Sequence, residues 1–84
     1  MIVQKWDHRN RVYNPHKIPD DWKVATFCSS MGTLVNCAQC GKLMHYGDCY
    51  TSREIHNPAG IGFAVCEDCY EAEWTREMEA QHEK

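Results

Sequence analysis

Two Cys-x-x-Cys pairs constrain the fold of this chain more than any other feature of its sequence. The pairs are Cys37–Cys40 and Cys66–Cys69, and 25 residues separate them. Two thiolates three positions apart can bind one ion within a tight turn, and a second pair from a distant segment completes a tetrahedron. The spacing predicts one zinc ion bound by four cysteines. We expect this zinc to be structural, because four protein ligands leave no open coordination position.

The cysteines could also form disulfides or bind iron. The chain has six cysteines, which would also permit a disulfide framework in an oxidising compartment. The N-terminal residues 1–7 contain no apolar region typical of an export signal. An iron–sulfur centre or a rubredoxin-type iron site uses the same ligands. We favour reduced, zinc-bound cysteines, and with them a cytoplasmic location.

The short length makes a bound metal important for stability. With 84 residues the chain can form one small domain, and the hydrophobic core of such a domain is marginal by itself. Binding of structural zinc supplies on the order of 10 kcal/mol in small zinc peptides. The sequence contains no run of about 18 apolar residues, so we predict no membrane-spanning helix and no membrane partner.

Short strands and turns are predicted between the two cysteine pairs. Gly41, directly after Cys40, is typical of a zinc knuckle, where the chain turns back with positive φ. Three segments rich in β-branched or aromatic residues are predicted strands: residues 43–46, 49–56 and 61–65. Turns that contain Gly or Asn-Pro separate them. We expect the second strand to return along the first as a hairpin.

The residues that follow the second pair predict a helix. From Glu67 to about Gln81 the sequence has no Gly or Pro and is rich in Glu, Ala, Met and Arg. Cys66 and Cys69 would then lie at the first helical turn. There the positive end of the helix dipole stabilises thiolates. A zinc ribbon, the main alternative, would continue as a strand at this point.

This order of elements resembles a treble-clef zinc finger. Two motifs carry the resemblance: Cys37-Ala-Gln-Cys40-Gly41-Lys42 and Val65-Cys66-Glu-Asp-Cys69-Tyr70. The first is also similar to the start of a LIM zinc finger, although the second LIM half is missing. The stretch 50–70 is faintly similar to small uncharacterised bacterial and mobile-element proteins. The resemblance covers about residues 34–82 and implies a small α+β zinc-stabilised domain with knuckle, β-hairpins and C-terminal helix.

The residues before the finger form an N-terminal arm, residues 1–33. The arm carries Trp6, Trp22 and Phe27, which are too many aromatic anchors for a free tail. Residues 22–27 are predicted to form a strand. We expect the arm to pack, in extended or strand conformation, on a zinc-binding module formed by residues 34–84. A tail that folds only on a partner is the alternative.

The remaining thiols and imidazoles give little support to catalysis. Cys28 and Cys49 lack a nearby cysteine partner and are predicted to be small buried thiols. A second metal site that combined them with His45 and His56 is the alternative. His8 is predicted to lie on the surface. Some treble clefs are nucleases of the His-Asn-His type, but this helix lacks the expected ligands, so we predict no enzyme activity.

Charge favours a protein partner for the helix. Residues 67–84 carry a net charge of −5, and residues 1–66 a net charge of +2. The acidic helix would repel phosphates. Tyr70, Trp74 and Met78 recur every four residues and form a narrow apolar stripe, with Trp74 and Met78 as candidate contacts. We expect a monomer that acts as a protein–protein interaction, regulatory or adaptor module and binds a basic partner.

Nucleic-acid binding is the alternative function. Lys5, Arg9 and Arg11 alternate with Trp6 and Tyr13 in the N-terminal arm. Basic side chains interleaved with aromatic rings can bind single-stranded nucleic acid by charge and by stacking. The arm and the hairpin after the knuckle would then form the binding surface.

Overall fold

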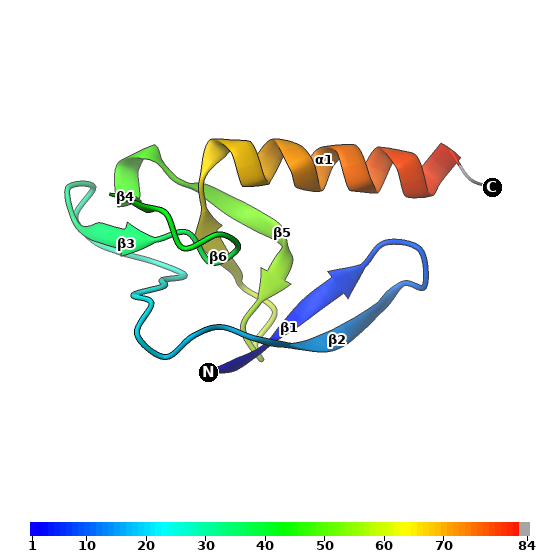
Figure 1. Ribbon diagram of the computed structural model, residues 1–84, viewed down its shortest axis with the longest axis horizontal. Coiled ribbons are helices and arrows are strands. Elements are labelled where there is room, and N and C mark those ends of the chain that lie inside the picture. The colour runs from blue at the N-terminus through cyan, green and yellow to red at the C-terminus, as the bar shows by residue number, and fades with distance from the viewer. Residues whose placement is uncertain (83–84) are drawn as a thin grey trace.

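The chain folds into a small α+β domain with two antiparallel sheets and a C-terminal helix (Figure 1). The computed structural model describes residues 1–82, without the side chain of the last of them. None of the described residues belongs to a helix with the length and hydropathy needed to cross a bilayer. The elements in chain order are β1 (Ile2–Asp7), β2 (Val12–Lys17), β3 (Leu34–Asn36), β4 (Leu43–His45), a 3-10 turn (Tyr46–Asp48), β5 (Tyr50–His56), β6 (Gly62–Val65) and α1 (Glu67–His82).

The larger sheet joins the N-terminal hairpin to the strands that precede the helix. Its order is β2-β1-β5-β6, and every neighbouring pair is antiparallel. β1 meets β5 where Gln4 lies opposite His56 and Lys5 opposite Ile55. Pro15 lies in β2 at the sheet edge, where its missing N–H costs no ladder bond. The N-terminal hairpin, residues 2–17, therefore belongs to the same sheet as β6, the strand that precedes α1.

The smaller sheet contains a strand that the sequence analysis missed. β3 pairs with β4, so that Leu34 lies opposite His45 and Asn36 opposite Leu43. The expectation that residues 49–56 return along residues 43–46 is wrong. The 3-10 turn after β4 instead leads the chain into β5 of the other sheet. Three residues of β3 are too few to show the alternation by which a strand is predicted.

The predicted strand at residues 22–27 is also wrong, since this segment has no regular structure. It lies between the two sheets and makes one backbone–backbone hydrogen bond to each, and the N–H of Lys23 also donates to the side chain of Asn36 at 2.7 Å. Asn36 of β3 donates its N–H to the carbonyl of Lys23 at 2.8 Å, and Ala64 of β6 donates to that of Ala25 at 2.8 Å. Single backbone bonds to two different strands do not build a ladder. Trp22 and Val24 pack against the core, whereas Phe27, expected to anchor the arm, is 76% exposed.

The hydrophobic core is small and includes part of the cysteine cluster. Its buried members come from β1, from the segment after β2, from β5, from β6 and from the turn between β3 and β4. They are Val3, Ile18, Cys37, Ala38, Ile55, Phe63, Val65 and Cys66. Trp22, Val24, Met44 and Tyr70 pack around them. The core thus reaches from the N-terminal hairpin to the start of α1.

The helix packs on β5 through a buried carboxylate. Glu73 is fully buried and accepts hydrogen bonds from Ser52 Oγ at 2.6 Å and from the backbone N–H of Arg53 at 2.7 Å. Ser52 Oγ in turn accepts from the N–H groups of Glu54 and Ile55 at 3.1 and 2.8 Å. The β5–β6 register shifts in this stretch, and Ser52 and Glu73 satisfy backbone N–H groups there. Burial raises the pKa of Glu73.

Ion pairs extend this polar contact along the helix. The guanidinium of Arg53 lies 2.9 Å from the carboxylate of Glu77. Arg76 donates two hydrogen bonds to buried Glu54, at 2.7 and 2.9 Å. Three consecutive residues of β5 are therefore bonded to α1 by polar groups. The face that α1 turns toward the sheet is defined by Glu73 and not by an apolar stripe.

The buried contact of Glu73 predicts a large effect of its removal. Glu73→Ala leaves the Arg53 N–H and the Ser52 hydroxyl without their acceptor, and we expect it to lower the free energy of unfolding by about 2–3 kcal/mol. Glu71→Ala, at an exposed position of the same helix, should change it by less than about 0.5 kcal/mol. Chemical denaturation with metal present in excess measures both. Equal losses would contradict the role assigned to Glu73.

Candidate metal centre

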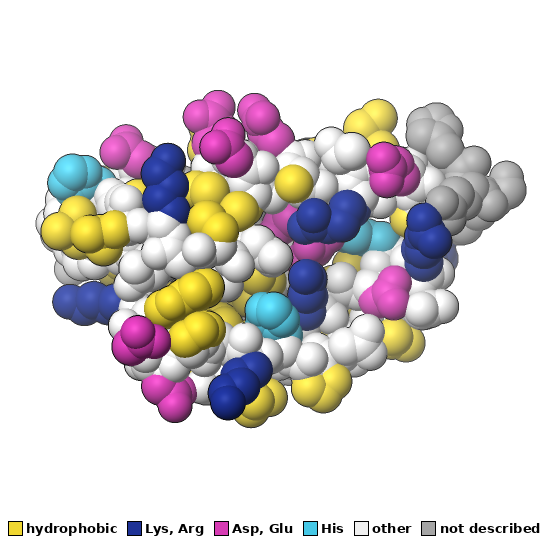
Figure 2. Space-filling view, viewed as in Figure 1, with side chains coloured by type: hydrophobic (Ala, Val, Ile, Leu, Met, Phe, Trp, Pro, Cys, Tyr) yellow, Lys and Arg dark blue, Asp and Glu magenta, His cyan; other side chains and the backbone are white. Residues whose placement is uncertain are grey.

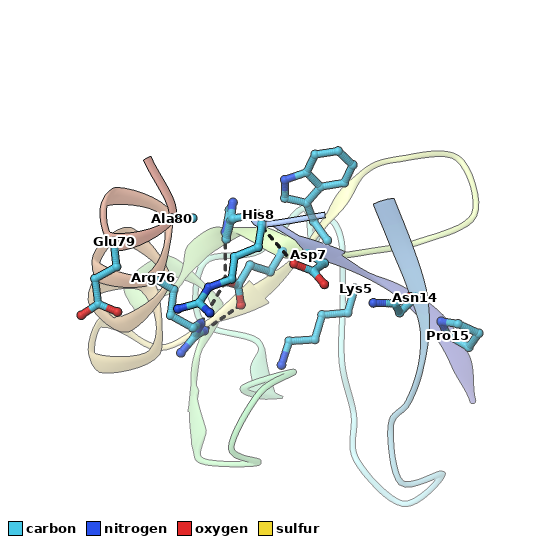
Figure 3. Close-up of a pocket in the computed structure, with 11 residues that line it drawn as sticks. Lys5, Asp7, His8, Asn14, Pro15, Arg76, Glu79 and Ala80 are labelled. Carbon is cyan, nitrogen blue, oxygen red and sulfur yellow. Dashed lines mark hydrogen bonds and ion pairs between the residues drawn. The ribbon is translucent and has the colours of Figure 1, made fainter. Parts of the chain in front are cut away.

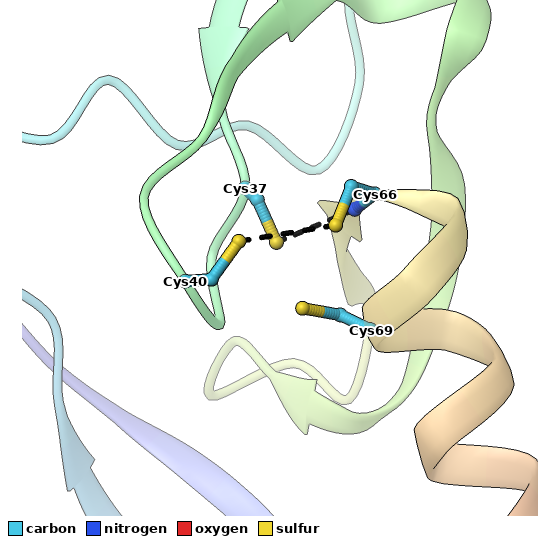
Figure 4. A group of neighbouring side chains, drawn as sticks. All are labelled: Cys37, Cys40, Cys66 and Cys69. Atoms are coloured by element: carbon cyan, nitrogen blue, oxygen red, sulfur yellow. Dashed lines mark hydrogen bonds between the residues drawn. The ribbon is translucent and has the colours of Figure 1, made fainter.

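The four cysteines of the two pairs converge at one point (Figure 4). Cys37 and Cys40 come from the turn between β3 and β4, and Cys66 and Cys69 from the start of α1. All four sulfur atoms lie within 4.8 Å of one another. The sulfur atoms of Cys40 and Cys66 are 3.8 Å apart. A tetrahedral ion with metal–sulfur bonds of about 2.3 Å spaces its ligands by about 3.8 Å, so the cluster could hold one metal ion.

The turn that presents the first pair is built by backbone hydrogen bonds. The N–H of Cys37 donates to the carbonyl of Lys42 at 2.8 Å, and the N–H of Gly41 donates to that of Cys37 at 2.9 Å. Gly41 has φ = 81°, which confirms the predicted left-handed turn after Cys40. The side chain of Asn36 closes the turn by donating to the Gly41 carbonyl at 2.9 Å.

Backbone amides surround the most buried sulfur of the cluster. Cys37 is fully buried, and its sulfur accepts N–H groups from Gln39 at 3.4 Å and from Cys66 at 3.3 Å. Burial by itself raises the pKa of Cys37, but the backbone N–H groups of Cys40, Cys66 and Gln39 together lower it below its ordinary value. The turn and the helix start thus both stabilise a thiolate at this position.

At two of the other cysteines the surroundings disfavour the thiolate form. The pKa of Cys69 is raised mainly by burial and to a smaller extent by hydrogen bonds with the neighbouring thiols. The pKa of Cys40 is raised as well, mainly by burial. A divalent cation among the four sulfurs would reverse this preference and hold them as thiolates. Thiolate ligands suit soft or borderline ions such as zinc and iron.

The other potential ligands do not join the cluster. Cys28 and Cys49 are half-buried, and the Cys49 thiol contacts the carbonyl of His45 at 3.3 Å. His56 Nδ1 is bonded to the hydroxyl of Tyr13 at 2.9 Å. Among the described side chains, no other three His, Cys, Asp or Glu residues converge as metal ligands do. The alternative of a second metal site therefore has no geometric support in the described part of the chain.

The candidate contact residues lie in two regions. Lys5, on β1, and Arg9, in the turn after β1, line one pocket. Arg11 lies at the end of the same turn, with φ = 54°, and does not line this pocket. Trp74 and Met78 are 41% and 52% exposed on α1. The predicted basic and apolar groups are therefore brought to different parts of the molecule.

The sequence analysis missed a polar cluster formed by His8, Glu54 and Arg76. The prediction that His8 lies on the surface is wrong, because it is only 11% exposed. Its Nε2 lies 3.0 Å from Oε2 of buried Glu54, which also binds Arg76. His8 and Glu54 are 46 residues apart in sequence, so no local pattern indicated their contact.

No family model matches this chain, and neither a curated protein nor a solved structure is significantly similar to it. What the chain binds is therefore inferred from its own residues.

The packing of the cysteine turn predicts unequal effects of two glycine substitutions. A Cβ at Gly41 would lie 2.6 Å from the ring of Trp22, whereas one at Gly60 would have no atom within 4 Å. Both residues have positive φ. Gly60→Ala should cost about 1 kcal/mol of unfolding free energy, and Gly41→Ala roughly 2–4 kcal/mol because Trp22 must move. Denaturant titration compares them, and equal costs would mean that Trp22 yields freely.

The cluster predicts which thiols hold metal. Native mass spectrometry should find one ion per chain in the wild type and in Cys28→Ser, and none tightly bound in Cys69→Ser. Thermal melts should show Cys69→Ser largely unfolded at 25 °C and Cys28→Ser little changed, since metal binding contributes to folding. If both variants kept their metal, the four-cysteine site would be wrong.

Proposed function

We propose that the four cysteines hold one structural zinc ion in a treble-clef module. Three observations support this proposal: the first pair lies in a turn with Gly41 at positive φ, the second lies at the start of α1, and backbone N–H groups point at the Cys37 sulfur. The ion would link the β3–β4 hairpin to α1. Four sulfur ligands would leave it no open position for substrate, which favours binding over catalysis as the role of the domain.

We further propose that the module binds a basic segment of a protein partner. The supporting observation is an acidic–aromatic surface, defined by Tyr50, Glu67, Tyr70, Glu71 and Trp74, which encloses a depression of about 320 Å³. The rings of Tyr50 and Tyr70 stack at 4.9 Å between centroids, and Trp74 meets Tyr70 edge-on at 6.3 Å. Acidic side chains gather over the first half of α1 (Figure 2).

The chemistry of this surface suits a lysine or arginine side chain. Aromatic faces attract cations, and carboxylates at the rim add a second favourable term. The guanidinium of Arg53 already lies 4.3 Å from the centre of the Trp74 ring, which is the geometry expected for such a contact. Met78, one turn further along α1 and 52% exposed, would extend the apolar contact. A regulatory or adaptor role is consistent with such a surface.

A pair of charge-reversed peptides tests this proposal. A peptide of alternating Lys, Arg and Gly residues should bind the metal-loaded protein and change the fluorescence of Trp74, while its Glu-substituted counterpart should not. Trp74→Ala should weaken binding at least about tenfold, and binding should fall with added salt. Leu43→Ala is the matched control, because Leu43 is an exposed apolar residue outside the acidic–aromatic surface. Equal loss in both variants, or binding of both peptides, would contradict the proposal.

Nucleic-acid binding is the second candidate. It is favoured by the presence of Lys5 and Arg9 beside Trp6 in one pocket. Labelled single- and double-stranded oligonucleotides, titrated at two salt concentrations, test it. Salt-sensitive binding that is lost in the double variant Arg9→Ala/Arg11→Ala would support this function. The absence of binding at low salt would exclude it.

A further inference from the structure

A pocket separates the β1–β2 hairpin from the C-terminal half of α1 (Figure 3). Its volume is about 460 Å³, which lies within the range of small-molecule sites. We call it the hairpin–helix pocket, and the residues that matter for its chemistry are Lys5, Trp6, His8, Asn14, Glu54 and Arg76. None of them belongs to the acidic–aromatic surface, so the inference below does not depend on the binding of a basic segment. Lys5 and Trp6 are shared with the nucleic-acid candidate, and the experiment below distinguishes the two.

A buried carboxylate fixes the cationic side of the pocket. Glu54 accepts two hydrogen bonds from Arg76, from Nη2 at 2.7 Å and Nε at 2.9 Å. It also contacts Nε2 of His8 at 3.0 Å. The hydrogen bonds to Glu54 raise the pKa of Arg76. A guanidinium has five N–H donors, so this pairing orients Arg76 while leaving further donors for a ligand.

Lys5 supplies a second cation from the opposite wall. Its half-buried side chain extends from β1 into the pocket toward Arg76 (Figure 3). Among the described residues it has no hydrogen bond or ion pair. An anion placed between Lys5 and Arg76 would give this ammonium group a counter-charge. Asn14, on β2, adds an amide at the same wall.

The acidic residues around the pocket compensate the charge of Arg76 but, among the described residues, form no ion pair with Lys5. Glu54 is saturated by Arg76 and His8. The carboxylate of Asp7 accepts hydrogen bonds within its own turn, from the N–H groups of residues 9 and 10 and from the amide of Asn10. Glu79 directs its carboxylate away from Lys5 (Figure 3). Among the described lining residues, the positive charges of Lys5, Arg9 and Arg76 are matched in number by the carboxylates of Asp7, Glu54 and Glu79. The groups left for an anion are the Lys5 ammonium and the remaining N–H donors of Arg76.

We propose that the hairpin–helix pocket binds a small organic phosphate. The Lys5 ammonium and the remaining N–H donors of Arg76 lie on opposite walls, and a phosphate has enough oxygen atoms to accept from both, which a fixed guanidinium favours. Trp6 also contributes to the lining of this pocket, and a contact with it would favour an organic part. The phosphate group lies between Lys5 and Arg76, and the organic part lies against Trp6.

Calorimetric titration of the full, metal-loaded chain tests this site. The probes are inorganic phosphate and adenosine monophosphate, with acetate as the carboxylate comparison. Lys5→Met should weaken phosphate binding at least about tenfold, which corresponds to one lost charge-assisted contact. The matched control is Lys17→Met, at an exposed lysine of the same hairpin that does not line the pocket. It should change the affinity less than about twofold.

Each outcome decides the proposal. Tighter binding of adenosine monophosphate than of inorganic phosphate, lost in Lys5→Met but kept in Lys17→Met, supports it. Equal weakening by both lysine variants, equal affinity for acetate, or no binding of either phosphate at about 10 mM overturns it. Binding only of a single-stranded oligonucleotide also overturns it, in favour of nucleic acid. A melting curve for each variant shows that Lys5→Met is folded, and Lys5→Gln replaces it if it is not.

Discussion

The convergence of four cysteine sulfurs is the constraint on which the rest of this structure depends. The hydrophobic core of a chain of this length is marginal by itself. Here two of the eight buried core residues are cysteines of the cluster, Cys37 and Cys66. The sulfurs bring together the turn of the smaller sheet and the start of α1, which are 25 residues apart in sequence. The cysteine cluster is therefore part of the hydrophobic core, and a change in one also affects the packing of the other.

The helix is placed on the sheet by polar contacts of high specificity. A buried carboxylate such as Glu73 is unfavourable unless its donors are positioned correctly. Ser52 and the backbone N–H of Arg53 provide those donors only at the register shift in β5. The contact thus fixes the rotation of α1 about its own axis and the position of α1 along β5. This arrangement leaves Trp74 41% exposed, whereas Tyr70 packs against the edge of the core.

The sequence predicted those elements whose signals are local. The two Cys-x-x-Cys pairs identified the cluster, and the run without Gly or Pro identified α1 almost to the residue. The strands near residues 43–46, 49–56 and 61–65 were also located. Their partners were not, because β3 has only three residues and the turn after β4 carries the chain between sheets. Contacts such as His8 with Glu54 depend on the folded sheet and leave no pattern in the chain.

The two ends of α1 are held by different means, and this has a consequence for local opening. Its first turn carries two of the clustered cysteines, and its second half is bound by Glu54, which in turn contacts His8 of the N-terminal hairpin. If a metal ion is bound by the cluster, its release would loosen the first turn before the Glu54 contacts break, as the first step toward global unfolding. Sub-global opening of this kind occurs at a free energy well below that of global unfolding. The helix would then fray from its N-terminus inward, and amide protons near Glu73 would exchange with solvent last.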